Sequence, residues 1–164
     1  MKKIVTIGVY GFDKEGFFKA LLDAQVDTFC DIRLRRGMRG SEYAFVNSES
    51  LQKRLSELGI RYIHVKGLAP TKAMREKQKQ EDAKLGIAKR SRKTLGQVFV
   101  NEYEKECLDH FSSNEFIELI GPEAEIISLF CVEGEPEACH RSLAARRLAR
   151  DLELPVEHVR PLIV

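Results

Sequence analysis

The residues best suited to chemistry lie within one short stretch near the end of the chain. An apolar run over residues 126–132 predicts a buried strand there, and the pattern after it predicts a helix that begins near Cys139. The free N–H groups at such a helix start favour a bound anion. The stretch also combines two thiols, a carboxylate, an imidazole and a guanidinium, from Cys131, Glu133, Cys139, His140 and Arg141.

Arg141 follows the predicted helix start, with His140 beside it. A guanidinium in that position can bind phosphate or carboxylate through two parallel hydrogen bonds, so we interpret both residues as anion ligands. The alternative is an ion pair between Arg141 and one of the loop acids Glu133, Glu135 and Glu137. The sequence leaves both interpretations open.

Cys139 is a candidate nucleophile, because a helix N-terminus and nearby cations favour the thiolate. The alternative is a buried structural cysteine. A Cys–Arg phosphatase loop is excluded by spacing, since only His140 separates Cys139 from Arg141. Thiolates and imidazole also suit zinc, but the spacing from Cys131 to Cys139 matches no recognised zinc pattern, so we predict no metal site.

The rest of the chain alternates between strand and helix patterns, which predicts a single α/β domain over residues 1–164. We expect a mainly parallel sheet of about five strands with helices on both faces. The predicted strands cover residues 4–9, 28–33, 60–65, 126–132 and 156–159, and the predicted helices cover 14–25, 48–58, 98–111, 114–120 and 141–152.

In a parallel sheet, ligands bind beyond the carboxyl ends of the strands, so polar residues at those ends should gather at one edge. His64 is a candidate for proton transfer, or alternatively a core histidine that hydrogen-bonds to the backbone. Glu133 is a candidate for a chemical role. Asp31 would orient an arginine, or alternatively cap the loop. The candidates at the other strand ends are Tyr10, Asp31, Arg33, Arg35, His64 and Cys131.

Charge is distributed unevenly along the chain, although the formal net charge is only +2. Residues 66–93 hold ten Lys/Arg against three acids, and residues 33–40 hold four arginines. Either segment can bind a polyanion, while a solvated basic helix is the plainer interpretation of 66–93. We expect 66–93 to be a basic helical or flexible insertion within the domain.

No stretch reaches the length of a membrane span, and the apolar run after Met1 is too short for a signal peptide. The four cysteines are therefore expected to be reduced thiols in a cytoplasmic protein, with no membrane partner.

Several of these motifs together resemble the family catalogued as domain of unknown function 488. The resemblance covers nearly the whole chain, and its most specific part is the motif Cys131-x-Glu133-x-x-Pro136-x-x-Cys139-His140-Arg141. Its other elements are Thr6-Ile7-Gly8, Asp31-Ile32-Arg33, Phe45 with Asn47, and Tyr62-Ile63-His64. The resemblance implies a small α/β fold with a site at these residues, and it implies no particular reaction.

The leading hypothesis is a binding site for a phosphate-bearing ligand, a nucleotide or nucleic acid, at the carboxyl ends of the strands. The first alternative is a thiol-dependent enzyme, acting in sulfur transfer or redox chemistry through Cys139. The second is a non-enzymatic nucleic-acid-binding module. The cofactors and protein partners stay unknown from the sequence, which also does not decide whether the chain is an enzyme.

Overall fold

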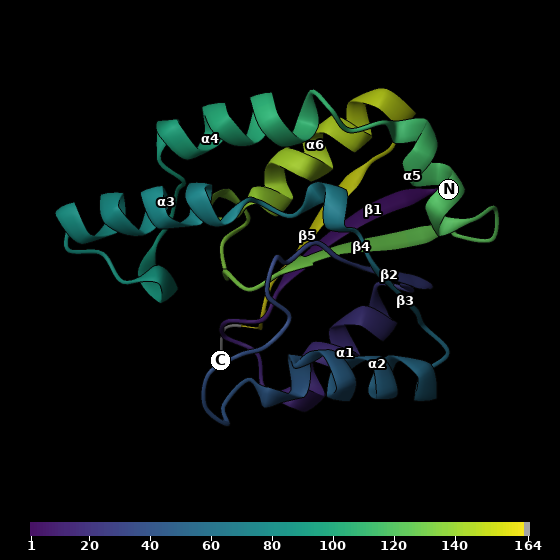
Figure 1. Ribbon diagram of the computed structural model, residues 1–164. Coiled ribbons are helices and arrows are strands. Elements are labelled where there is room, and N and C mark those ends of the chain that lie inside the picture. Colours follow the sequence, from purple (N-terminus) through teal and green to yellow (C-terminus); the bar gives the residue numbers. More distant parts are fainter. Residues whose placement is uncertain (163–164) are drawn as a thin grey trace.

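A single five-stranded sheet forms the centre of the molecule in the computed structural model, which describes residues 1–162 (Figure 1). All neighbouring strands are parallel, and their order is β3-β2-β4-β1-β5. The strands are β1 (Lys3–Gly8), β2 (Thr28–Asp31), β3 (Arg61–His64), β4 (Ile126–Cys131) and β5 (Val156–Val159).

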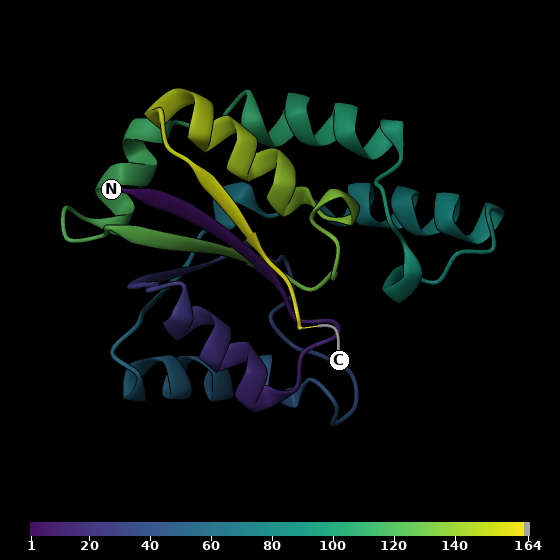
Figure 2. The same ribbon diagram turned by 180° about the vertical axis from the view of Figure 1, so that it is seen from behind.

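Helices cover both faces of this sheet, as Figures 1 and 2 show from opposite sides. On one face lie α1 (Lys14–Asp23) and α2 (Ser48–Glu57), and on the other lie α4 (Gln97–Tyr103), α5 (Ser113–Ile120) and α6 (His140–Leu152). The helix α3 (Lys72–Lys84) projects beyond the carboxyl ends of the strands.

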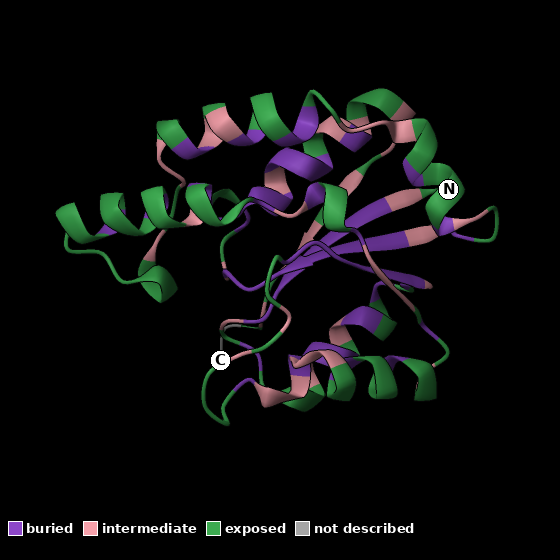
Figure 3. Cartoon of the chain, in the orientation of Figure 1, coloured by how far each residue is buried: buried purple, intermediate pink, exposed green. Residues whose placement is uncertain are grey.

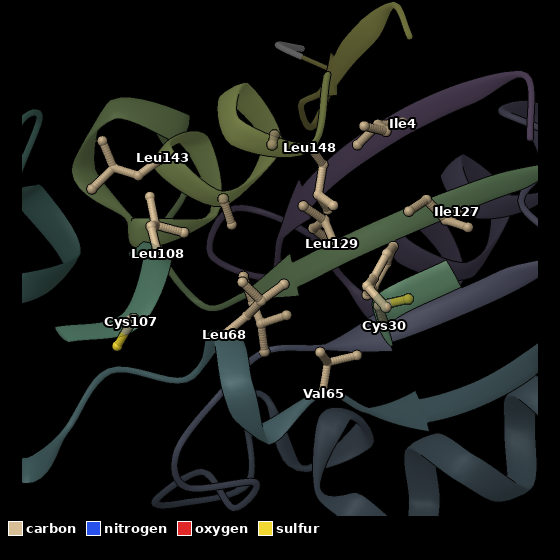
Figure 4. Packing of buried hydrophobic residues seen from close by; sticks show 14 of the residues in the cluster. Ile4, Cys30, Val65, Leu68, Cys107, Leu108, Ile127, Leu129, Leu143 and Leu148 are labelled. Atoms are coloured by element: carbon tan, nitrogen blue, oxygen red, sulfur yellow. The ribbon is translucent and has the colours of Figure 1, made fainter. Parts of the chain in front are cut away.

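The central strands are mostly apolar because helices bury both of their sides. In Figure 3 these strands are coloured as buried, whereas α3 is largely exposed. Two apolar clusters result, one on each face of the sheet. Figure 4 shows part of one of them, where Leu148 of α6 lies beside Leu129 of β4 and Ile4 of β1, and Leu143 of α6 lies beside Leu108.

The predicted fold class is confirmed, and the elements differ from expectation mainly at their ends. The region 98–111 forms α4 followed by a π-helical turn, Glu104–Leu108, rather than one regular helix. Short 3₁₀ turns occupy several connections: Ala44–Val46, Lys66–Leu68, Lys89–Ser91 and Pro136–Ala138. No helix among residues 1–162 is long and apolar enough to cross a membrane.

The basic segment 66–93 contains a docked helix. Thr71 caps α3 by accepting a hydrogen bond from the Met74 N–H at 3.2 Å. The buried residues of α3 are Met74, Gln78 and Asp82, which recur every four positions and so share one face. Two of the three are polar, so α3 is held mainly by hydrogen bonds and ion pairs instead of an apolar stripe.

Candidate functional site at the carboxyl ends of the strands

A cavity of about 890 Å³ opens at the carboxyl ends of the strands. The loop after β2, the helix α3 and the 3₁₀ turn Lys89–Ser91 line its walls, so the two basic segments of the sequence face the same space. Nine Lys or Arg residues line it against four acids, a formal net charge of +5. Its volume lies within the range of small-molecule sites, roughly 300–1,000 Å³.

One part of the cavity wall carries two thiols and an imidazole. Cys131 is the last residue of β4, and Cys139 and His140 begin α6. Both sulfur atoms lie 3.7 Å from Nδ1 of His140, and the three atoms are mutually within 4.8 Å. All three residues line the cavity although each is at most 5% exposed.

Local backbone structure fixes these three side chains. Cys139 is the N-cap of α6, where its sulfur accepts a hydrogen bond from the Arg141 N–H at 3.5 Å. The other ring nitrogen of His140, Nε2, lies 2.8 Å from the carbonyl oxygen of Ile32, just after β2. A carbonyl only accepts, so Nε2 carries a proton, and when the ring is neutral Nδ1 presents its lone pair to the sulfurs. Burial lowers the pKa of His140, but Cys131, the Ile32 carbonyl and Glu133 outweigh it and raise the pKa above its ordinary value.

Glu133 adds a buried carboxylate beside the thiols. Its Oε2 accepts a hydrogen bond from the Cys131 thiol at 3.1 Å, and its Oε1 lies 3.0 Å from Nη2 of Arg92 and 3.6 Å from Nζ of Lys89. Burial by itself raises the pKa of Glu133, but Lys89, Arg92 and the thiol outweigh it and lower the pKa to about 2. Glu133 is therefore ionised at neutral pH and cannot donate a proton there.

The surroundings of Cys131 shift its pKa in the opposite direction. Burial, then the adjacent Cys139 and Glu133, raise the pKa of Cys131 well above the ordinary value for a thiol. Cys131 thus remains protonated at neutral pH unless a cation stabilises its thiolate.

Arg92 connects α3 to this part of the wall. Its guanidinium lies 2.7 Å from Asp82 of α3 and 3.0 Å from Glu133, and it donates to the carbonyl of Ala138 at 2.9 Å. Nearby, Gln78 of α3 accepts a hydrogen bond from the Gly96 N–H at 2.9 Å. These contacts hold α3 and the segment after it against the candidate site.

Arg33 belongs to a buried network at the end of β2. It forms two hydrogen bonds with Asp31, of 2.9 and 2.8 Å, and another with the carbonyl of Val46. The Tyr62 hydroxyl donates to Asp31 at 2.7 Å, and His64 Nε2 lies 2.9 Å from the carbonyl oxygen of Arg33. Arg33 lines the cavity, whereas Asp31 and His64 contact Arg33 from the side away from the cavity.

Arg141 is fully buried and does not line the cavity. Its guanidinium donates to the carbonyls of Glu133 and Gly134, which fixes the loop between β4 and α6. This loop passes so close to Gly8 of β1 that a Cβ there would overlap the Glu133 carbonyl. The placement of Arg141 favours the loop-holding role over direct anion binding.

An aromatic and basic group forms another part of the wall. The rings of Tyr10 and Tyr43 lie 5.4 Å apart, and the Arg90 guanidinium sits over both, at 5.3 and 5.2 Å. Glu42 pairs with Arg90 at 3.1 Å. A planar cation on aromatic faces is a surface on which a base or ring can stack.

The carboxyl ends of the strands bring the sequence-predicted residues together at one edge. Those that line the cavity are Tyr10, Arg33, Arg35, Cys131, Glu133, Cys139 and His140, whereas Asp31, His64 and Arg141 lie behind its wall. The sequence interpretation gave no individual role to Asp82, Lys89, Arg90 or Arg92. A pattern that could have pointed to Asp82 is its spacing of four residues from Gln78 and eight from Met74, which places all three on one face of a helix.

The fold and the site therefore define an α/β protein of the parallel-sheet class with a polar, basic cavity at the strand ends. The model of the family named domain of unknown function DUF488 matches residues 13–148. The chain belongs to this family, as its motifs indicated. Neither a curated protein nor a solved structure matches the chain significantly.

Proposed function

We propose that the protein binds a phosphate-bearing ligand of nucleotide size in the cavity at the carboxyl ends of its strands. The observation that carries the proposal is the excess of cations in the cavity wall. Four of the nine Lys and Arg side chains form ion pairs. The other five have no ion-pair partner within residues 1–162: Arg35, Arg39, Lys72, Arg75 and Lys79.

Two further features support an anionic ligand. Nη1 of Arg33 is buried and has no hydrogen-bond partner among the described residues, although Arg33 lines the cavity. A buried N–H group without a partner is costly, and an anion oxygen would satisfy it. The Tyr10–Tyr43–Arg90 group offers a stacking surface for the base of a nucleotide.

The test is isothermal titration of the full chain with inorganic phosphate, pyrophosphate, a nucleoside triphosphate and a short single-stranded oligonucleotide. Arg75→Ala with Lys79→Ala should weaken binding by at least about tenfold, or about 1.4 kcal/mol. The matched control is Lys53→Ala with Lys105→Ala, which removes two exposed cations away from the cavity. Absence of binding, or equal losses in both double variants, would contradict the proposal.

The oligonucleotide arm separates the ligand classes. If only the oligonucleotide binds, and its affinity falls steeply with salt, the protein is a nucleic-acid-binding module instead. Neutralising Lys89, Arg90, Arg92 and Lys93 should then weaken binding, and unchanged affinity would exclude this alternative.

Thiol chemistry at Cys139 is a second candidate, favoured by its position between the α6 N-terminus and His140 Nδ1. The helix N-terminus can stabilise a thiolate, and Nδ1 of His140 can accept the thiol proton. The measurement is iodoacetamide labelling of reduced protein across pH. A Cys139 that reacts well below the ordinary thiol pKa of about 8.5 supports this function, and ordinary reactivity excludes it.

A further inference from the structure

The geometry points to a metal site: we propose that Cys131, Cys139 and His140 bind one divalent transition-metal ion such as zinc, with a fourth coordination position open to the cavity. This proposal does not depend on phosphate binding. It starts from three donor atoms that two separate elements bring together, the end of β4 and the start of α6.

The spacing of the donor atoms suits a tetrahedral ion. Bond lengths of about 2.3 Å to sulfur and about 2.0 Å to nitrogen place sulfur and nitrogen ligands about 3.5 Å apart. Both Sγ–Nδ1 distances are 3.7 Å. The two sulfur atoms lie within 4.8 Å of each other, so small side-chain rotations complete the coordination geometry.

The orientation of His140 is the arrangement that metal-binding histidines use. Its Nε2–H is held by the Ile32 carbonyl at 2.8 Å, which leaves Nδ1 free to donate a lone pair to the ion. In addition, the hydrogen bonds of Arg141 to Glu133 and Gly134 fix the loop that separates the cysteines. The backbone that carries the three ligands is therefore fixed before the ion arrives.

Charge also balances in this site. Two thiolates neutralise a divalent ion, and the imidazole ligand is neutral, while Glu133 already has Arg92 and Lys89 as partners. Without the ion, one thiol proton is held by Glu133 and the other by His140 Nδ1. Binding then converts two thiols to thiolates and releases two protons to solvent.

Two thiolates and one imidazole select zinc over calcium or magnesium, which prefer oxygen ligands. Because all three ligands line the cavity, water or a ligand atom from the cavity can occupy the fourth position. Three protein ligands with an open position are the arrangement of catalytic rather than structural zinc sites. With the ion bound, both sulfurs are ligands, so this proposal competes with thiol catalysis by Cys139.

The experiment adds Zn²⁺ and Co²⁺ separately to the full chain, stripped of metal and kept reduced with a phosphine. We expect one tightly bound ion per chain, a sulfur-to-cobalt charge-transfer band and tetrahedral cobalt bands. Titration calorimetry of Zn²⁺ in buffers of different ionisation enthalpy should give about two protons released near pH 7.

Variants locate the site. Cys131→Ser, Cys139→Ser and His140→Gln should each weaken Zn²⁺ binding by more than about 100-fold, beyond the typical loss for an outer-shell substitution. Cys107→Ser is the matched control, since Figure 4 shows Cys107 at the edge of the apolar cluster and its thiol donates to the Ala69 carbonyl.

Circular dichroism checks that each variant folds, and the cobalt spectrum of the unmodified chain tests the site even if a variant does not. Bound Co²⁺ without a sulfur charge-transfer band would overturn the proposal. Absence of tight binding, or equal affinity in the Cys139→Ser and Cys107→Ser variants, would do so as well.

Discussion

Asp31 and Arg33 form a buried ion pair beneath the candidate site, with side chains 0% and 3% exposed. Breaking such a pair leaves a charge without a partner in a place that water does not reach. We predict that Asp31→Asn lowers the free energy of unfolding by about 3–5 kcal/mol in urea denaturation. The control, Asp23→Asn, breaks the exposed Lys19–Asp23 pair and should cost less than about 1 kcal/mol. Equal costs for the two variants would contradict this account of the network.

Gly8 is a second residue whose identity follows from its surroundings. A methyl group at this position would overlap the backbone of Glu133 and approach the Arg141 guanidinium to 2.7 Å. We predict that Gly8→Ala lowers the free energy of unfolding by about 1–3 kcal/mol because the loop must shift. Gly37→Ala, where no atom lies within 4 Å of the new methyl group, should change it by less than about 0.5 kcal/mol. A harmless Gly8→Ala variant would show that the loop has more room than the structure gives it.

At the scale of elements, Arg92 decides how firmly α3 docks. It connects Asp82 of α3 with Glu133 and Ala138 beside the thiols, and its side chain is 8% exposed. We predict that Arg92→Gln increases amide hydrogen exchange in α3 while exchange in the central strands stays unchanged. Lys93→Gln, an exposed neighbour, should leave both unchanged. Unaltered protection of α3 in the Arg92 variant would mean that other contacts hold the helix.

The docking of α3 is a feature of the fold that the sequence did not predict. The strands were predictable because burial on both faces demands long apolar runs, as in 126–132. Segment 66–93 has few apolar residues, so periodicity did not reveal a docked helix. Its anchors are polar, and their partners Glu133 and Ala138 lie more than forty positions away. Arg141 similarly looked like an anion ligand, because its carbonyl partners depend on the path of the loop.

At the scale of the whole molecule, the parallel sheet made the location of the site predictable. Carboxyl ends of parallel strands meet at one edge, so Tyr10, Arg33 and Cys131 converge although over a hundred residues separate the first from the last. Which residues face the cavity was not predictable, since His64 and Asp31 end strands as well and yet lie behind its wall. That difference depends on side-chain packing, which strand order alone does not determine.

The charge of the cavity gives a prediction at this scale. If a triphosphate releases counterions from five unpaired cations, its affinity should fall as salt rises, because salt screens exposed charges. Titrations at about 50 and about 200 mM salt should show this loss in the unmodified chain. The loss should be smaller for the Arg35→Ala, Arg39→Ala double variant. Affinity that does not respond to salt would indicate recognition by other groups.

The most direct test of the central claim is a nuclear magnetic resonance titration of the full chain with a nucleoside triphosphate. The account predicts that amide shifts concentrate in residues 33–40, 72–79, 89–92 and 131–140, the segments around the cavity. Residues of α5, which line no part of the cavity and lie beside the C-terminal part of α6, should stay unchanged. Shifts centred elsewhere, or none at millimolar ligand, would contradict the claim that this cavity is the functional site.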